Sequence, residues 1–305
     1  MHLSKQLRGH LFAGFTILIW GTTFISTKLL LRAFSPAEIL LIRFLLGYLA
    51  LWAFNPRLLH LQERRHELWC AGAGLCGITI YYAFENIALQ YSTASNIGVI
   101  VSTAPLFTAI FASFLLKGEP LKPNFFAGFA AAIIGVFLLN YSGSAVRLNP
   151  KGDVLALAAA VAWGVYSILV RRLSEAGYPP ALLTRRFFLW GLVFMLPYVL
   201  HSGFSPSMEE IMQPVYLFNL AHLSFLAGAV GFVSWNTAVG YLGAVKSSVY
   251  IYITPVVTII VAAVVLGERL TAAGALGVLL VILGVILSDG RGLPRRHREE
   301  TNHVG

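Results

Sequence analysis

The sequence contains few charged residues. Of its 305 residues, 11% are Asp, Glu, Lys or Arg and 57% are hydrophobic, whereas soluble domains carry about a quarter charged residues. Apolar stretches of roughly 20 residues, each long enough to cross a hydrocarbon core as a helix, recur along nearly the whole chain. The composition therefore excludes an ordinary water-soluble domain and predicts an all-α membrane protein.

Cysteine is scarce, and the common catalytic motifs are absent. Cys70 and Cys76 lie six residues apart inside an apolar run, which suits neither a disulfide framework nor a metal site. The sequence has no Gly-Lys dipeptide and hence no P-loop, and His66-Glu67 is followed by Cys70 where an HExxH zinc motif needs histidine. We therefore assign no catalytic residue, no metal and no cofactor.

Positive charge exceeds negative charge, with a formal net charge of +9. The Lys and Arg residues are spread over short loops between apolar runs, which suits a topology signal rather than nucleic-acid binding. Lys5 and Arg8 precede the first apolar run as in a signal peptide, but this run continues for a full span with no small-residue cleavage site. It is predicted to be a retained first helix.

Ten membrane spans can be drawn from the apolar runs. The connections are short and carry Pro, Gly or charge, and the longest external one, about 201–215, is predicted to be a surface loop. The basic stretch 289–305 is predicted to be a disordered cytoplasmic tail. The spans are predicted at 11–31, 36–54, 68–90, 94–116, 122–142, 152–172, 179–200, 216–240, 245–266 and 270–288.

The two halves of the chain repeat each other. Trp20 lies 143 residues before Trp163, and Asn86 lies 150 residues before Asn236; small loop insertions explain the change of spacing. Each half contains five spans, an odd number, so the second half enters the membrane from the opposite side. Two inverted repeats around a central cavity are the usual framework of a secondary transporter.

The distribution of Lys and Arg predicts the orientation. If the N-terminus is inside the cell, the internal segments hold fourteen of these residues and the external segments hold four. This asymmetry predicts that both termini are cytoplasmic and that the chain is a multi-pass protein of the cell (inner) membrane. The predicted domains are the repeats at 11–142 and 152–288, followed by the tail.

Several motifs recur in the same order in both halves. Trp-Gly stands in the first span, Arg-Phe in the second, a proline midway through the fourth, and Gly-Glu-x-Leu before the fifth, at residues 118–121 and 267–270. This set resembles the EamA repeat of the drug/metabolite transporter superfamily over about residues 11–288. The resemblance implies a ten-helix secondary transporter with a central cavity, often an exporter of amino acids or other small metabolites.

Polar and aromatic side chains follow helical spacing along several spans. Such faces are expected to point inward, where they either join helices by hydrogen bonds or line a hydrated cavity. Large or amide side chains that recur across the two halves favour the lining role. The predicted substrate-binding residues are Trp20, Tyr82, Asn86, Trp163, Asn236 and Tyr250.

Pro105 and Pro255 fall near the middles of the fourth and ninth predicted spans. Each proline lacks an N–H and so frees the carbonyl four residues earlier, at Val101 and Ile251. A free carbonyl in lipid is costly, so it should face protein, water or ligand. We predict two helix kinks, either for packing or at the binding site.

Glu85 is the only carboxylate well inside a predicted span, and intramembrane ionisable groups default to functional hypotheses. Arg43 lies at a comparable depth, within reach for pairing. The alternatives are a structural ion pair with Arg43, a proton-coupling role, and a contact to the amine of a substrate.

These observations predict a secondary transporter, and more specifically an exporter of small metabolites such as amino acids, working by alternating access. The alternatives are a carrier for drugs or other solutes, an intramembrane enzyme, and a channel. An enzyme would need a paired base and nucleophile or metal ligands at one depth, which the sequence lacks. The expected partners are a small-molecule substrate, the lipid bilayer and, if Glu85 couples transport, protons.

Overall fold

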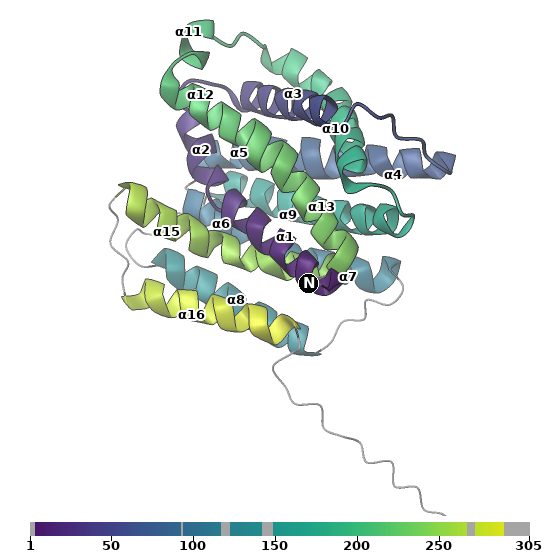
Figure 1. Ribbon diagram of the computed structural model, residues 1–305. Helices are drawn as coiled ribbons and strands as arrows, with labels where there is room; N and C mark the ends of the chain where they lie inside the picture. Colours follow the sequence, from purple (N-terminus) through teal and green to yellow (C-terminus); the bar gives the residue numbers. More distant parts are fainter. Residues whose placement is uncertain (1–3, 93, 117–122, 142–148, 267–271, 290–305) are drawn as a thin grey trace, which may run out of the picture.

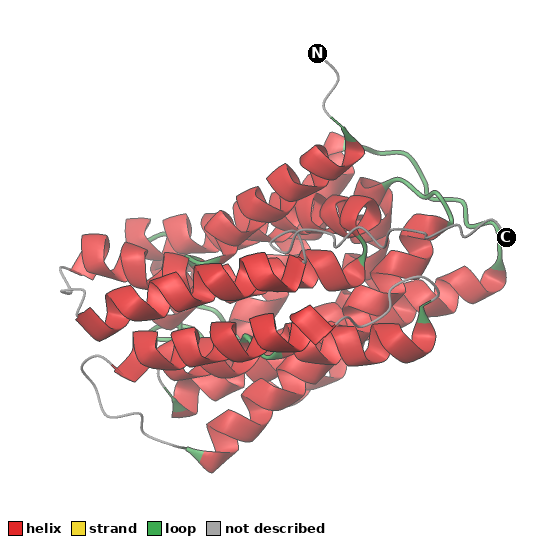
Figure 2. Ribbon diagram, turned by 90° about the horizontal axis from the view of Figure 1, so that it is seen from below, coloured by secondary structure: helices red, strands yellow, loops and turns green. Residues whose placement is uncertain are grey.

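The protein is a bundle of helices that lie side by side (Figure 1). The computed structural model describes residues 4–92, 94–116, 123–141, 149–266 and 272–289, and that part of the chain contains helices and loops but no strand (Figure 2). Helices pair their backbone N–H and C=O groups internally, as hydrocarbon surroundings require. Within the described residues, five helical segments are long and apolar enough to cross a membrane: Lys5–Leu30, Pro36–Phe54, Pro150–Glu175, Pro180–Ser202 and Pro214–Leu242.

The described residues of the first half form eight α-helices and one π-helical segment. They are α1 (Lys5–Trp20), α2 (Thr23–Leu30), α3 (Pro36–Phe54), α4 (Arg64–Gly74), the π-helical segment Leu75–Ile80, α5 (Tyr81–Tyr91), α6 (Ala94–Val101), α7 (Ala104–Leu115) and α8 (Pro123–Tyr141). The predicted run 36–54 coincides with α3, whereas the first helix begins at Lys5 rather than at residue 11.

The second half also interrupts its α-helices with other helical forms. Its elements are α9 (Pro150–Glu175), α10 (Pro180–Ser202), α11 (Met208–Ile211), α12 (Pro214–Ala221), the π-helical segment His222–Val230, α13 (Gly231–Leu242), α14 (Ala244–Ser248), the 3₁₀ segment Val249–Ile253, α15 (Thr254–Leu266) and α16 (Ala272–Asp289).

The start of α3 shows how the sequence begins a helix. The backbone N–H of Glu38 donates to the Ser35 hydroxyl (3.3 Å) and the Glu38 carboxylate accepts from the Ser35 N–H (2.8 Å), with Pro36 in the first turn. This capping box satisfies two N–H groups that the helix itself cannot pair. The second oxygen of Glu38 accepts from the N–H of Ser205 (3.2 Å), which ties α3 to the loop after α10.

Close helix approach breaks the first predicted span into α1 and α2. A Cβ atom at Gly21 would lie 2.5 Å from the Cβ of Val257 in α15, so only glycine allows this approach. The Thr258 hydroxyl donates to the Gly21 carbonyl at 2.6 Å. The break therefore brings the end of α1 against α15, and Trp20 lies just before it.

The last helices of the two halves, α8 and α16, pack against each other along a seam of glycines (Figure 1). A Cβ at Gly135 would lie 2.7 Å from the carbonyl oxygen of Gly277, and a Cβ at Gly284 would lie 2.6 Å from that of Gly128. Small residues let helix backbones approach closely in membranes. These four glycines form packing faces, not a site.

Two predicted features lie outside the described residues. The tail predicted at 289–305 is described only at Asp289, where α16 ends, and the junctions 118–121 and 267–270 are not described.

Candidate functional site

A narrow cavity lies among the interrupted helices of both halves. Its volume is about 40 Å³, enough for a few water molecules but far below the several hundred Å³ typical of sites for drug-sized ligands. A solute of that size therefore needs the cavity to widen. The lining residues are Trp20, Thr23, Phe24, Tyr81, Tyr82, Glu85, Gly98, Val101, Ser102, Ala104, Trp163, Ile251 and Thr254.

Aromatic rings form much of the cavity wall. The ring centroids of Trp20 and Trp163 lie 5.3 Å apart with nearly perpendicular planes, and those of Tyr81 and Trp163 lie 4.9 Å apart. Such pairs contribute about 0.5–1.5 kcal/mol each beyond the area they bury. The Trp20 indole N–H donates to the Ala227 carbonyl (3.0 Å), whereas the buried Trp163 Nε1 has no hydrogen-bond partner. Trp163 therefore leaves a free donor in the cavity wall.

Glu85 provides the carboxylate of the cavity. It is 3% exposed, a side-chain hydrogen bond links it to Tyr81 one turn earlier, and its Oε2 atom has no partner. Leaving a buried carboxylate oxygen unpaired is unfavourable. Glu85 therefore brings an unpaired carboxylate oxygen to the lining of the cavity.

Arg43 lies behind the Tyr82 ring rather than against Glu85. Its guanidinium carbon is 4.2 Å from the Tyr82 ring centroid, and Nη2 donates to the Tyr82 hydroxyl at 3.3 Å. The ion pairs found among the described residues do not include Arg43 with Glu85. The two charges interact through space, without the direct contact that the sequence suggested as one alternative.

The two prolines stand where helices restart beside the cavity. Pro105 lies in the first turn of α7, which begins after a break at residues 102–103, and Pro255 lies in the first turn of α15, which follows the 3₁₀ segment. A first-turn proline needs no helical donor. The residues four positions before these prolines, Val101 and Ile251, both line the cavity, and the Ile251 carbonyl accepts a 3₁₀ hydrogen bond from the Thr254 N–H.

Three of the six predicted binding residues line the cavity, and three lie outside it. Trp20, Tyr82 and Trp163 are lining residues, whereas Asn86, Asn236 and Tyr250 are not. Asn86 donates to the Pro36 carbonyl (3.4 Å), and Tyr250 Oη lies 2.7 Å from His10 Nδ1.

Asn236 supports the cavity wall from behind. Its Oδ1 accepts from the Tyr166 hydroxyl at 2.6 Å and its Nδ2 donates to the Thr184 hydroxyl at 2.8 Å. The Tyr166 ring in turn packs on Trp163, with centroids 4.9 Å apart. Asn236 therefore hydrogen-bonds a residue behind the cavity wall and does not itself line the cavity.

Sequence reasoning missed Tyr81 and Phe24 as lining residues. Tyr81 precedes Tyr82 and stands four residues before Glu85, a spacing that places it on the Glu85 face of the helix. That spacing was the available signal. Phe24 sits in an apolar run and carries no such signal.

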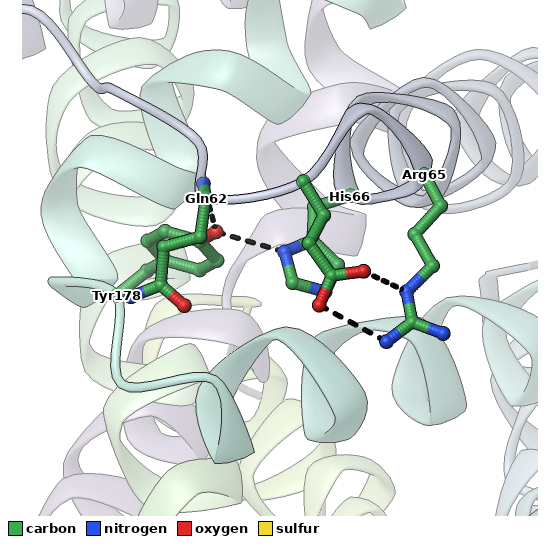
Figure 3. Close-up of polar contacts among 5 residues, drawn as sticks. Gln62, Arg65, His66 and Tyr178 are labelled. Carbon is green, nitrogen blue, oxygen red and sulfur yellow. Dashed lines mark hydrogen bonds and ion pairs between the residues drawn. The ribbon is translucent and has the colours of Figure 1, made fainter.

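A polar network joins the connection before α4 to the turn between α9 and α10 (Figure 3). The backbone N–H of Gln62 donates to the Tyr178 hydroxyl (2.7 Å), and His66 Nδ1 lies 2.8 Å from the same oxygen. Beside it, Arg65 forms an ion pair with Glu63 at 2.5 Å. These contacts connect the two halves of the chain at one end of the bundle.

Further contacts strengthen this connection. Arg186 of α10 forms an ion pair with Glu67 of α4 (2.8 Å), and the Trp190 indole N–H donates to the same carboxylate (2.5 Å). Arg185 stacks on Trp52, 4.2 Å from the ring centroid, and donates to the carbonyls of Asn55 and Arg57. The neighbouring arginines thus hold the α3–α4 connection against α10.

Together these features define a helical, multi-pass membrane protein with a nearly closed polar and aromatic cavity. The family model described as the EamA-like transporter family matches residues 7–141 and 150–288. The chain therefore belongs to the EamA-like transporter family, and this membership points to a transporter rather than an enzyme.

Relatives along the whole chain carry transporter names. A protein of Archaeoglobus fulgidus named "Uncharacterized transporter" is 31% identical over 92% of this chain and 97% of its own length. A "Probable terminal-alkyne amino-acid exporter" of Streptantibioticus cattleyicolor is 30% identical over 94% and 95%. A "Probable amino-acid metabolite efflux pump" of Salmonella typhimurium is 26% identical over 89% and 91%.

The fold also matches a solved structure. One crystal structure shares 23% identity with the chain at a TM-score of 0.71, covering 94% of this chain and 98% of its own. At this identity the match shows the fold alone.

Proposed function

We propose that this chain is a secondary transporter that exports small metabolites of the amino-acid class by alternating access. The observation that carries the proposal is the cavity itself, which both sequence halves line, the first with Trp20 and Glu85 and the second with Trp163. Interrupted helices with freed backbone groups at a shared site are typical of secondary transporters. The names of the Streptantibioticus and Salmonella relatives support the cargo class.

The proposed topology has ten spans in two inverted repeats, 11–142 and 152–288. Both termini then lie in the cytoplasm of a cell whose inner membrane holds the protein, as the Lys and Arg distribution indicates. In this arrangement the α3–α4 connection and the α9–α10 turn are cytoplasmic. The contacts of Tyr178, Arg185 and Arg186 then close the cytoplasmic side of the cavity.

The lining assigns roles to three side chains. Trp20 and Tyr82 bring ring faces against an apolar part of the cargo, and the free Trp163 N–H donates to an acceptor on it. A few placed polar groups in an otherwise apolar wall are the usual design of a small-molecule site. An apolar drug would use the same ring faces, so other solutes are the alternative cargo.

Counterflow in liposomes tests the proposal. Purified full-length protein is reconstituted with an unlabelled amino acid inside, and entry of the same labelled amino acid is followed across a panel. A carrier produces saturable uptake that depends on internal substrate. It carries an unlabelled molecule out as it changes conformation, and it then binds a labelled molecule on the outer side. Flux that neither saturates nor responds to internal substrate indicates a channel, and exchange only of non-amino-acid solutes removes the amino-acid assignment.

A further inference from the structure

The cavity around Glu85 is lined by residues that suit a positively charged group. We propose that this cavity binds the ammonium group of a cargo that carries an apolar substituent, with the free Oε2 of Glu85 as its anionic partner. The inference rests on the proposed transport function and narrows its cargo to amines and ammonium-bearing metabolites.

The carboxylate is the first argument. Glu85 is 3% exposed, and its Oε2 has no hydrogen-bond partner. Its one side-chain hydrogen bond is to Tyr81. A buried carboxylate is stable when it is paired and hydrogen-bonded, and an ammonium group supplies both a charge and up to three donors.

Arg43 helps to hold this charge without using the free oxygen. Its guanidinium lies over the Tyr82 ring and bonds the Tyr82 hydroxyl, so the ring separates it from the cavity. A cation at that position favours an ionised Glu85 through space, since Coulomb interactions extend several ångströms in a medium of low dielectric. Arg43 therefore lowers the cost of ionising the buried Glu85 and leaves its Oε2 without a partner.

The rest of the cavity wall also carries groups with partial negative charge. The rings of Trp20, Tyr81, Tyr82 and Trp163 line it, and aromatic faces attract cations. Val101 also lines it, and its carbonyl lacks the N–H that residue 105 would donate in a continuous helix, because that residue is a proline.

The hydroxyl groups of the lining also act as acceptors. The Thr23 hydroxyl donates to the Trp20 carbonyl (2.8 Å), and the Ser102 hydroxyl donates to the Gly98 carbonyl (2.7 Å). Each hydroxyl donates its only proton to a backbone carbonyl, so its lone pairs can still accept a hydrogen bond from a ligand. None of the described lining residues is Lys or Arg. The cavity therefore favours a cation over an anion.

The aromatic walls distinguish an organic ammonium group from a bare metal cation. Sodium is coordinated by oxygen atoms, whereas five of the described lining residues are aromatic. Ring faces pack well against the carbon atoms next to an ammonium group.

Three matched probes test the inference in the full-length protein in detergent. Benzylammonium, benzyl alcohol and benzoate share one ring and differ in charge, and all are added at pH 7 with thermal unfolding as the readout. A ligand that binds only the folded state raises the unfolding temperature. Benzylammonium is expected to do so, and the alcohol and the carboxylate are not. Equal shifts with benzylammonium and benzyl alcohol overturn the inference.

Variants assign the effect to Glu85. Glu85→Gln keeps the shape and removes the charge, so benzylammonium should bind at least about tenfold more weakly, the loss expected for a charge-assisted hydrogen bond. Glu85→Asp should keep the preference for benzylammonium over benzyl alcohol. Glu175→Gln is the control, because Glu175 is half exposed and paired with Arg171 far from the lining residues. Unchanged benzylammonium affinity in a folded Glu85→Gln protein overturns the inference.

A further arm tests a small-ion site. Replacing potassium with sodium in the buffer should leave the unfolding temperature unchanged. A Glu85-dependent rise of the unfolding temperature in sodium, without a rise in benzylammonium, overturns the ammonium assignment.

The transport function can fail separately. If benzylammonium binds through Glu85 but no solute undergoes counterflow, the subsite stands and the carrier proposal fails. If amino-acid counterflow persists unchanged in Glu85→Gln, the carrier proposal stands and the subsite fails.

Discussion

Trp20 and Trp163, which occupy matching positions in the two halves of the sequence, meet edge to face with ring centroids 5.3 Å apart. Both are buried, and both line the same cavity. Two equivalent residues meet in this way if the halves are related by a symmetry axis that passes close to both. The contact therefore supports the inverted-repeat proposal, with the cavity near the axis.

The free indole donor of Trp163 yields the first prediction. Trp163→Phe removes an N–H that bonds nothing in the protein, so transport should show a KM about two- to tenfold higher, as expected for one lost hydrogen bond to cargo. Trp235→Phe is the matched control, because its Nε1 is also buried and unpartnered but the residue does not line the cavity. Counterflow kinetics and thermal unfolding are measured on both variants. Equal KM changes in the two would contradict a binding role for Trp163.

The second prediction separates support from binding at Asn236. Asn236→Ala leaves the buried Tyr166 hydroxyl without its acceptor and should lower the free energy of unfolding by about 1–3 kcal/mol. Transport per folded molecule should stay nearly unchanged, because Asn236 lies outside the cavity. Chemical or thermal unfolding in detergent gives the first quantity, and counterflow normalised to folded protein gives the second. Full stability with lost transport would instead favour the direct substrate contact that the sequence pattern suggested.

Hydrophobic runs predict helices because they indicate burial in lipid or in the core, and α3 matches its predicted bounds of 36–54. Five helical segments among the described residues are long and apolar enough to cross a membrane, so the ten spans stay a prediction. It did not predict the break between α1 and α2. Gly21 and Thr22 are compatible with a continuous helix, and the break arises where Gly21 meets Val257, a residue of the other half of the chain. A contact of that kind leaves no local pattern.

Residues of the candidate site could be predicted where their side chains differ from the apolar sequence around them or recur in both halves. Glu85 stood out as a charge in an apolar run, and Trp20 and Trp163 stood out through the repeat. Asn236 and Tyr250 follow the same spacing yet bond Tyr166 and His10 outside the cavity. Helical spacing identifies an inward face, but packing decides whether that face meets a helix or a cavity.

The third prediction concerns the glycine seam between α8 and α16. Gly135→Ala places a Cβ within 2.7 Å of the Gly277 carbonyl oxygen, so the helices must separate at a cost of about 1–3 kcal/mol. Gly14→Ala is the control, because no atom lies within 4 Å of a Cβ there and alanine favours the helix by up to about 1 kcal/mol. The unfolding temperature should fall for Gly135→Ala and should stay level or rise for Gly14→Ala. Equal stability in the two variants would exclude close packing at this seam.

The last prediction tests the topology on which the transport proposal depends. His60 and Ser207 are both exposed, the first in the α3–α4 connection and the second just before α11. Single cysteines are introduced as His60→Cys and Ser207→Cys after Cys70 and Cys76 are changed to alanine. An impermeant thiol reagent should label the second variant in intact cells and the first only after the membrane is opened, because the Lys and Arg distribution predicts that the α3–α4 connection is cytoplasmic. Labelling from outside at position 60 but not at 207 reverses the orientation, and labelling at both excludes an odd number of spans between them. Only labelling at both positions would remove the basis for two inverted five-helix repeats, since five spans separate these positions in the proposed topology, whereas the reversed pattern would place both termini outside the cell.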